Sequence, residues 1–199
     1  MTDRPILFSG PMVRALLDGR KTQTRRVIKS PSVKHPCFSL LCHDDVNNVW
    51  WPYYSDDGES SVTDDGLEQP VECLFGQPGD RLWVREAWAF HPDYPESTRR
   101  AIYRANAGVE FDVDRWRPSI HMPRWASRIM LEITGVRVER LNEISGADCI
   151  AEGIVEADAP SYIFGLQEAY RDLWESINGT GSWAVNPWVW VIEFRRTKP

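Results

Sequence analysis

The chain lacks the features that mark membrane-spanning proteins and secreted, disulfide-rich proteins. Its longest apolar runs are far shorter than the roughly 20 residues that a membrane-spanning helix needs. None of these runs has the form of a signal sequence. Only 4 cysteines occur in 199 residues, too few for a dense disulfide framework. These absences predict a cytoplasmic protein with free thiols and no contact with a membrane.

Motifs for bound metals and for phosphate-binding loops are equally scarce. The 4 histidines are scattered and form no His-Glu-x-x-His pattern. Cys37, Cys42, His43 and Cys73 form a loose set that lacks the Cys-x-x-Cys pairs of most structural zinc sites. The chain has neither a glycine-rich phosphate loop nor a Gly-x-Ser-x-Gly nucleophile turn. We therefore expect no metal and no cofactor.

Charge is distributed unevenly along the chain, although the net charge is only −6. Residues 44–72 contain nine acidic residues and neither lysine nor arginine, which leaves 23 basic and 20 acidic residues elsewhere, a net charge of +3. The basic residues concentrate in 14–29 and 115–128. A basic face beside an acidic segment is compatible with a site for a nucleotide or a short RNA. On charge alone, a purely solvating role is an equally good interpretation.

Hydrophobic periodicity and turn residues divide the chain into short strands and helices. The expected strands span residues 21–28, 82–87, 101–104, 129–140 and 188–194. The expected helices span residues 12–17, 145–154 and 165–177. Within 129–140, Gly135 is expected to mark a β-bulge. Because the strands are not separated by regular helices, a doubly wound sheet is not expected.

The residues from about 30 to 76 lose this periodicity and are rich in Pro, Asp, Asn and Gly. We interpret them as an acidic insertion, with a short hairpin near 49–54, in a single domain that spans 1–199. Short strands, few helices and many turns predict an α+β fold that is mainly β. The expected architecture is a small β-barrel decorated by short helices.

The segment from Gly19 to Arg26 is the most informative part of the chain. Gly19 follows an amphipathic run and is expected to end a helix, since glycine tolerates the left-handed conformation. Lys21 and Thr24 lie on opposite faces of a regular strand, so they converge only if the chain bends after the glycine. A converging lysine and hydroxyl can act as base and nucleophile. Judged from spacing alone, a solvated turn is the more common outcome.

Two further segments combine basic and aromatic residues. Arg85 and Glu86 point to opposite faces of an expected strand, so one of them lines a pocket or both lie on the surface. Residues 115–128 are too rich in proline for a helix and suit a loop that holds phosphates and stacks a base. The alternative is a packed loop whose tryptophans close one end of the barrel. The candidate ligand-binding residues in this loop are His121, Arg124, Trp125 and Arg128.

Asp148 and Glu152 are a candidate carboxylate pair on the expected helix 145–154. They are four residues apart and therefore share a face. A carboxylate close to Lys21 would orient the lysine or keep it charged. A desolvated lysine would instead have a lowered pKa and could serve as a base. Taken alone, such a pair more often lies on a solvated helix face.

Gly19, Lys21, Thr24 and Arg26 together resemble the signature of the ASCH domain family. The signature has a glycine, a lysine two residues later, an acidic or hydroxyl residue three further on, and an arginine two beyond that. The chain also resembles a phage and prophage branch of this family. The segments that carry the second resemblance are 79–86, 118–128, 147–154 and 186–190.

The resemblance implies a PUA-like β-barrel, a fold associated with RNA. One ASCH branch comprises small amidohydrolases that remove the acetyl group from N4-acetylcytidine. Transferred to this sequence, that activity makes Thr24 the nucleophile, Lys21 its activating base, and Glu152 the acid/base partner of the leaving amine. Other members are linked to RNA binding without catalysis or to a metal-independent ribonuclease activity, for which Lys21 and Arg26 would be the candidate residues. The expected partner is a nucleoside or RNA, and the oligomeric state is left open.

The resemblance and the loop composition together suggest which residues bind the substrate. The set is Arg26, Arg85, Glu86, His121, Arg124, Trp125 and Arg128. The acidic insertion and the 115–128 loop are additions relative to the small amidohydrolases. They could narrow, gate or replace the substrate site, so the natural substrate is not determined by the resemblance.

Overall fold

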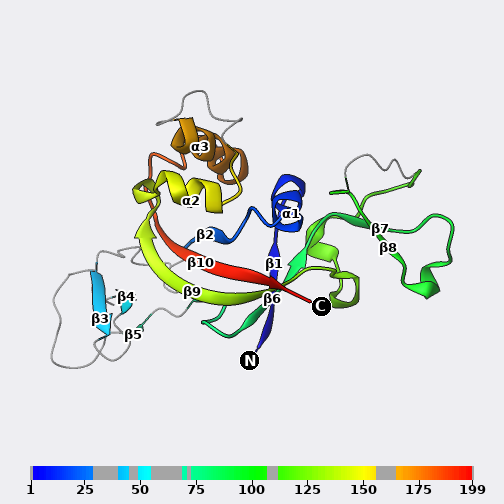
Figure 1. Ribbon diagram of the computed structural model, residues 1–199, viewed down its shortest axis with the longest axis horizontal. Helices are drawn as coiled ribbons and strands as arrows, with labels where there is room; N and C mark the ends of the chain where they lie inside the picture. The colour runs from blue at the N-terminus through cyan, green and yellow to red at the C-terminus, as the bar shows by residue number, and fades with distance from the viewer. Residues whose placement is uncertain are drawn as a thin grey trace.

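A computed structural model describes residues 2–28, 73–106, 112–155 and 165–198, together with the backbone of strand segments 40–44, 49–54 and 69–70. Its centre is a five-stranded sheet with the strand order β1-β6-β9-β10-β2 (Figure 1). β1 and β6 are parallel and the other neighbours are antiparallel. The strands are β1 (Asp3–Leu7), β2 (Gln23–Val27), β6 (Arg81–Arg85), β9 (Met130–Arg140) and β10 (Trp188–Thr197).

Two smaller sheets flank this central sheet. One is formed by β3 (Leu40–Asp44), β4 (Val49–Tyr54) and β5 (Gln69–Pro70), and β4 lies beside β9. The acidic segment, expected to be mostly irregular, thus contains a small antiparallel sheet in which β4 is the middle strand. The other is the hairpin of β7 (Trp88–Phe90) and β8 (Ala101–Tyr103).

The described helices are short and cover both faces of the central sheet. The α-helices are α1 (Gly10–Leu17), α2 (Gly146–Ala151) and α3 (Gly165–Asn178). Single 3₁₀ turns are formed by η1 (Glu96–Thr98), η2 (Ser119–His121), η3 (Arg124–Ala126) and η4 (Leu141–Glu143). Within the described parts of the chain, no helix combines the length and the apolar character needed to cross a lipid bilayer.

The turn between α1 and β2 bends the chain as the glycine predicts. Gly19 adopts a φ of 77°, and the backbone N–H groups of both Arg20 and Lys21 donate to the carbonyl of Ala15. These bonds fold the chain back onto the end of α1. As a result β2 begins only at Gln23, and Lys21 lies in the turn rather than in the strand where it was expected.

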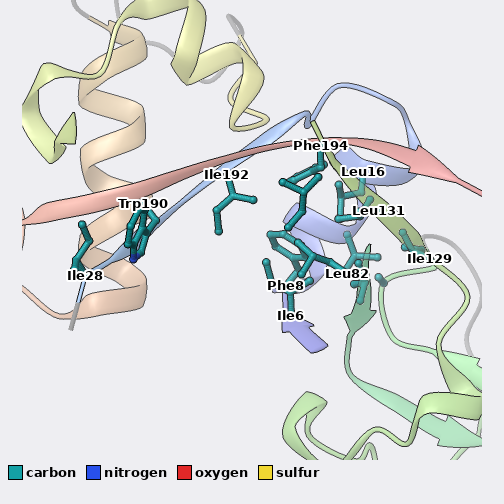
Figure 2. Close-up of a cluster of buried hydrophobic side chains, with 14 residues drawn as sticks. Ile6, Phe8, Leu16, Ile28, Leu82, Ile129, Leu131, Trp190, Ile192 and Phe194 are labelled. Atoms are coloured by element: carbon teal, nitrogen blue, oxygen red, sulfur yellow. The ribbon is translucent and has the colours of Figure 1, made fainter. Parts of the chain in front are cut away.

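Hydrophobic side chains fill the space on each side of the central sheet. The alternation of β10 sends Trp190, Ile192 and Phe194 to one face and Val189 and Val191 to the other. On the first face these residues pack with α1 and with residues of β1, β6 and β9 (Figure 2). On the second face α2 and α3 cover the sheet, and α3 contributes Leu166, Tyr170 and Trp174. The central sheet therefore has a hydrophobic core on each of its two faces.

The structure confirms a mixed fold with more strand than helix. The described strands form an open sheet whose edges are β1 and β2, and they do not close into the expected barrel. The expected bulge in β9 is present next to Gly135. The register skips Thr134, since Glu193 pairs with Gly135 and Phe194 with Ile133. α3 matches its predicted span, and Ile177 at its end is exposed.

Candidate functional site

Lys21 and Glu152 form a buried ion pair between the α1–β2 turn and the end of α2. Lys21 Nζ lies 2.7 Å from Glu152 Oε2, and it also donates to the backbone carbonyl of Glu152 at 2.8 Å. The two side chains are only 0% and 2% exposed. Two residues that are 131 positions apart in sequence thus meet in a site shielded from water.

The capping of α2 determines where Glu152 lies. Ser145 caps the N-terminus by accepting a hydrogen bond from the backbone N–H of Asp148, and the Asp148 carboxylate accepts one from the backbone N–H of Ser145. The helix is short, and Glu152 is its C-cap residue. The structure contains the predicted helix, but it ends at Ala151 rather than Ile154, and Glu152 is buried at its C-terminus rather than exposed on its face.

Close packing joins the end of α2 to the turn that carries Lys21. The backbone N–H of Thr22 donates to the carbonyl of Ala151 at 2.8 Å. Gly153 has a φ of 100°, and a Cβ added there would lie 3.0 Å from Cβ of Ala15 and 3.4 Å from Cβ of Lys21. Glycine is thus required at 153 both by its conformation and by the close approach of the two segments.

Burial changes the protonation chemistry of Lys21. It lowers the pKa of the amine from its ordinary value of 10.5, because the charged form is removed from water. Glu152 opposes this effect through its charge and its hydrogen bond, whereas the cations Arg25 and Arg26 add to it. The net pKa is lowered. Lys21 therefore becomes a neutral amine, able to accept a proton, at a lower pH than an exposed lysine.

Arg25 extends the ion pair into a network that the sequence did not reveal. Its guanidinium lies 3.4 Å from Glu152, 2.9 Å from Glu139 and 3.4 Å from Asp148. Arg137 forms an outer layer and contacts Asp148 at 3.1 Å. The Glu152 carboxylate is thus held between two cations, Lys21 and Arg25, and its position is restrained from both sides.

Thr24 and Arg26 occupy the opposite face of β2 from Arg25. Thr24 is opposite Ile192 in the sheet and is 2% exposed. Arg26 donates to the carbonyl of Leu7 at 2.7 Å, and its guanidinium lies 5.3 Å from the centre of the Phe8 ring. Because Lys21 Nζ lies 5.6 Å from the same ring, the lysine and the Thr24 face of β2 border one region around Phe8.

The expected triad is brought together only in part. Lys21 and Glu152 are in direct contact, and Thr24 is buried three residues beyond the lysine. Within the described residues, no hydrogen bond joins the Thr24 hydroxyl to either partner. The structure thus brings Lys21 and Glu152 into contact, and Thr24 follows in β2, after the turn that carries the lysine.

Glu86 and Arg128, two of the expected substrate-binding residues, instead bind each other. Arg128 donates two hydrogen bonds to the Glu86 carboxylate, at 2.9 and 3.0 Å, and Glu86 is buried. Arg128 also donates to Asn106 and lies 3.9 Å from the centre of the Tyr103 ring. With its donors engaged, the Arg128 guanidinium serves to fasten the β7–β8 hairpin to the sheet.

The other expected binding residues lie apart from the ion pair. Arg85 lies over the ring of Trp83 and donates to the carbonyl of Ile120. His121 is exposed, and Arg124 is exposed with its guanidinium 3.4 Å from Asp3. Trp125 stacks on Phe90, with ring centres 5.8 Å apart, and is 38% exposed. Arg85 thus ends β6, whereas His121 lies in η2 and Arg124 and Trp125 lie in η3, next to β1 and the β7–β8 hairpin.

Three functional candidates near the ion pair were missed in the sequence: Phe8, Arg25 and Tyr170. Burial raises the pKa of the Tyr170 hydroxyl well above 10.0, and the nearby Glu152 charge adds to this effect. Tyr170 lies on the buried face of α3, a position that helical periodicity alone marks as core. The sequence did contain a signal for Arg25, namely its position between Thr24 and Arg26. Because side chains alternate between the two faces of a strand, Arg25 points toward the helices that carry the carboxylates.

The residues with described side chains contain no group of three or more His, Cys, Asp or Glu arranged to hold a metal ion. Of the loose cysteine and histidine set, only Cys73 lies among them. It is a free, half-buried thiol whose pKa is raised by burial. The side chains of Cys37, Cys42 and His43 lie outside the described residues.

Asp148 is expected to contribute stability that is lost at low pH. Burial opposes its ionisation, but hydrogen bonds from Ser145 and Gln23 and the charge of Arg25 hold its pKa at about 2, below the ordinary 3.8. Because the folded pKa is the lower one, the stabilisation is complete above the unfolded value and disappears as the pH falls toward about 2. The stabilisation contributed by the ionised Asp148 carboxylate amounts to about 2 kcal/mol.

Urea unfolding of Asp148→Asn at several pH values tests this expectation. The variant should be less stable than the wild type near pH 6, and the difference should shrink as the pH falls from about 4 toward about 2. Asp172→Asn, at an exposed position on α3, is the matched control and should show little change. A difference that is independent of pH would contradict the expectation.

Comparison with known proteins adds no relative to this picture. A scan against models of protein families, a search of curated proteins and a search of solved structures each found no match. The resemblance to the ASCH family is therefore carried by the motifs quoted above.

Proposed function

We propose that the chain is an amidohydrolase that removes the acyl group from an N4-acylated cytidine, such as N4-acetylcytidine. The observation that carries the proposal is the buried Lys21–Glu152 pair, in which Nζ and Oε2 lie 2.7 Å apart. Burial also lowers the pKa of Lys21. A base and an acid in direct contact and shielded from water are the groups that amide cleavage through a hydroxyl nucleophile requires.

In the proposed reaction, the Thr24 hydroxyl attacks the carbonyl carbon of the acyl group and neutral Lys21 accepts its proton. The proton passes along the hydrogen bond from Lys21 to Glu152, which delivers it to the N4 nitrogen as the carbon–nitrogen bond breaks. Cytidine leaves and the acyl group remains as an ester on Thr24. Water then hydrolyses the ester, releases the carboxylic acid and restores the hydroxyl.

Arg26 and Phe8 are the proposed substrate-binding residues next to these groups. The Arg26 Nε–H is buried and has no hydrogen-bond partner in the described part of the chain, so it is available to an oxygen of the substrate. Phe8 is only 4% exposed, and it borders both Lys21 and Arg26, so its ring would form one wall of a site for a base held between them. A neutral, planar base that carries a carbonyl group matches both features.

We also propose that the fold is related to the PUA-like barrels that the family resemblance implies. The mixed five-stranded sheet, with α1 between β1 and β2 and with strongly curved β9 and β10, supports this relationship (Figure 1). The described strands leave the sheet open between its two edges. The free thiols of Cys73 and Cys149 are consistent with the proposed cytoplasmic location.

Incubating the purified chain with N4-acetylcytidine, and following cytidine by chromatography, tests the proposed function. Cytidine should form, and kcat/KM should rise with pH until Lys21 is neutral. The midpoint should lie below pH 10.5, because burial lowers the pKa of this amine. Absence of cytidine at high enzyme concentration would exclude this substrate, and a rate independent of pH would exclude Lys21 as the base.

A second candidate is an RNA- or nucleotide-binding module without turnover. It is favoured by one observation, namely that among the described residues no hydrogen bond links the Thr24 hydroxyl to Lys21. The two candidates differ in their dependence on Thr24. A binding module tolerates Thr24→Val, whereas the hydrolase requires the hydroxyl.

A further inference from the structure

Arg25 is a second buried cation at the Glu152 carboxylate. Its side chain is 0% exposed, and its guanidinium lies within 3.4 Å of three carboxylates, those of Glu139, Asp148 and Glu152. A buried guanidinium needs a carboxylate partner, and Glu139, at 2.9 Å, already supplies one. The contact with Glu152 is therefore not required to compensate the charge of Arg25, and its consequence lies at Glu152.

The two oxygens of the Glu152 carboxylate face different cations. Oε2 lies 2.7 Å from Nζ of Lys21, and Oε1 lies 3.4 Å from Nη1 of Arg25. The last torsion of a glutamate side chain has a broad energy minimum, so a single contact leaves the carboxylate free to turn. With a cation at each oxygen, such a turn breaks both contacts. Arg25 thus keeps Oε2 directed at the amine.

This division also determines which oxygen of Glu152 carries the transferred proton. In the proposed reaction the proton passes from Lys21 to Glu152 and then to the N4 nitrogen of the substrate. The positive charge of Arg25 disfavours a proton at Oε1, because like charges repel. The proton is therefore carried on Oε2, the oxygen that faces the amine supplying it.

The position of Arg25 is itself fixed by the central sheet and by α2. Arg25 and Arg137 both lie opposite Val191 of β10, so their side chains share one face of the sheet. Glu139 contacts both arginines. Asp148 of α2 also contacts both, at 3.4 and 3.1 Å. Cations and carboxylates therefore alternate across this face and restrain the Arg25 guanidinium.

The charge of Arg25 also acts on the amine of Lys21. Burial is the largest cause of the lowered pKa of Lys21, and the charges of Arg26 and Arg25 lower it further. Glu152 opposes these effects, and in the described part of the chain these three are the charged groups that act on the amine. A cation at position 25 therefore favours the neutral amine, the form that accepts the proton of the Thr24 hydroxyl.

We propose that Arg25 is a positioning residue of the amidohydrolase site, which holds Glu152 so that only Oε2 exchanges the proton with Lys21. Arg25 does not touch the substrate in this arrangement, and it acts through Glu152 and through its own charge. This inference rests on the proposed function, because it assigns a role within the same reaction.

Hydrolysis of N4-acetylcytidine by Arg25 variants, followed as a function of pH, tests this role. Arg25→Gln should lower kcat by about 10–100-fold with little change in KM, since a displaced carboxylate misaligns proton transfer and leaves substrate binding intact. The midpoint of the rise of kcat/KM with pH should move upward, because a cation that lowers the pKa of Lys21 is removed. Arg25→Lys should keep the midpoint but lose kcat, because an ammonium lacks the planar fork that reaches three carboxylates.

Titration of the chain without substrate measures the effect of Arg25 on the amine directly. The chain has only 4 lysines, so the Cε signal of Lys21 can be followed by NMR with isotope-labelled lysine and assigned by its loss in Lys21→Met. The titration midpoint should be higher in Arg25→Gln than in the wild type. Arg137→Gln is the matched control. It removes the same charge from the same face, but Arg137 is not among the groups that act on the amine, so the midpoint should not move.

A compensated variant covers the case in which Arg25→Gln fails to fold. Arg25→Gln combined with Glu139→Gln removes one charge of each sign and leaves the net charge of the network unchanged. It should show the same loss of kcat and the same upward shift of the Lys21 titration. An equal fall of kcat in Arg25→Gln and Arg25→Lys, with an unmoved midpoint in both, is the pattern of a merely structural role and would overturn the inference.

The inference and the proposed function fail in different measurements. Hydrolysis that Arg25→Gln and the compensated variant leave unchanged would overturn the role of Arg25 and leave the hydrolase intact. An upward shift of the Lys21 titration in Arg25→Gln, in a chain that hydrolyses no acetylated cytidine, would overturn the hydrolase and support the action of Arg25 on the amine.

Discussion

Thr24→Val is expected to abolish the hydrolysis of N4-acetylcytidine, lowering kcat/KM by roughly 10³-fold or more. Valine has nearly the shape of threonine, so it fills the buried position opposite Ile192 and removes only the nucleophilic hydroxyl. Release of cytidine, measured at several substrate concentrations, gives the loss. Thr22→Val is the matched control, because Thr22 is exposed and only its backbone N–H contacts α2.

Lys21→Met is expected to cause a loss of similar size through a different step. Methionine fills the buried space of the lysine stem but cannot accept the proton of the hydroxyl. The control is Lys198→Met, which changes an exposed lysine near the end of the chain. If either Thr24→Val or Lys21→Met kept more than about a tenth of the wild-type kcat/KM, the assigned mechanism would be wrong.

Glu152→Leu is expected to lower the free energy of unfolding by about 3–5 kcal/mol. The substitution removes the carboxylate that compensates Lys21, whose side chain is fully buried. Arg25 keeps Glu139 and Asp148 as partners, so Lys21 is the cation left without one. Urea unfolding at neutral pH measures the change, with the exposed Glu143→Gln as the control.

The pH dependence of this loss has a defined sign. Without Glu152 the pKa of Lys21 is lowered further in the folded chain, whereas in the unfolded chain it stays near 10.5. The unfolded chain then binds more protons between these two values, so stability rises with pH in that window. The cost of Glu152→Leu should therefore be largest near neutral pH and should shrink as the pH approaches 10.5.

A double variant separates the ion pair from simple loss of packing. Lys21→Met combined with Glu152→Leu replaces both charges by apolar groups and should recover most of the lost stability. If the double variant lost as much free energy of unfolding as the two single variants together, shape rather than charge would explain the effect of Glu152→Leu.

The local structure was largely determined by the sequence. Gly19 ends α1 because glycine alone adopts a positive φ without strain, and this bend removes Lys21 from the strand. Ser145 and Asp148 start α2 through reciprocal hydrogen bonds between residues close in sequence. The alternation of side chains predicted the strands at 129–140 and 188–194, because the side chains on one face of each strand must be buried. In each case the interacting groups are neighbours along the chain, so a short segment carries the information.

Only the tertiary structure decided which charges meet. Lys21 could have faced water, but the packing of α2 on the α1–β2 turn placed it against Glu152 and excluded solvent from both. The same process paired Glu86 with Arg128. It also left the sheet open between β1 and β2 in the described residues, where composition had predicted a closed barrel.

The physical reason for this division is the range of the interactions. Turns and helix caps depend on backbone conformation within a few residues, whereas burial and ion pairing depend on contacts between segments that are far apart in sequence. The pKa of Lys21 illustrates the difference. Burial lowers it, and a carboxylate 131 residues away opposes that lowering. The sequence by itself determined that a lysine, a threonine and a carboxylate are present, and the fold decided that the lysine and the carboxylate share one buried site.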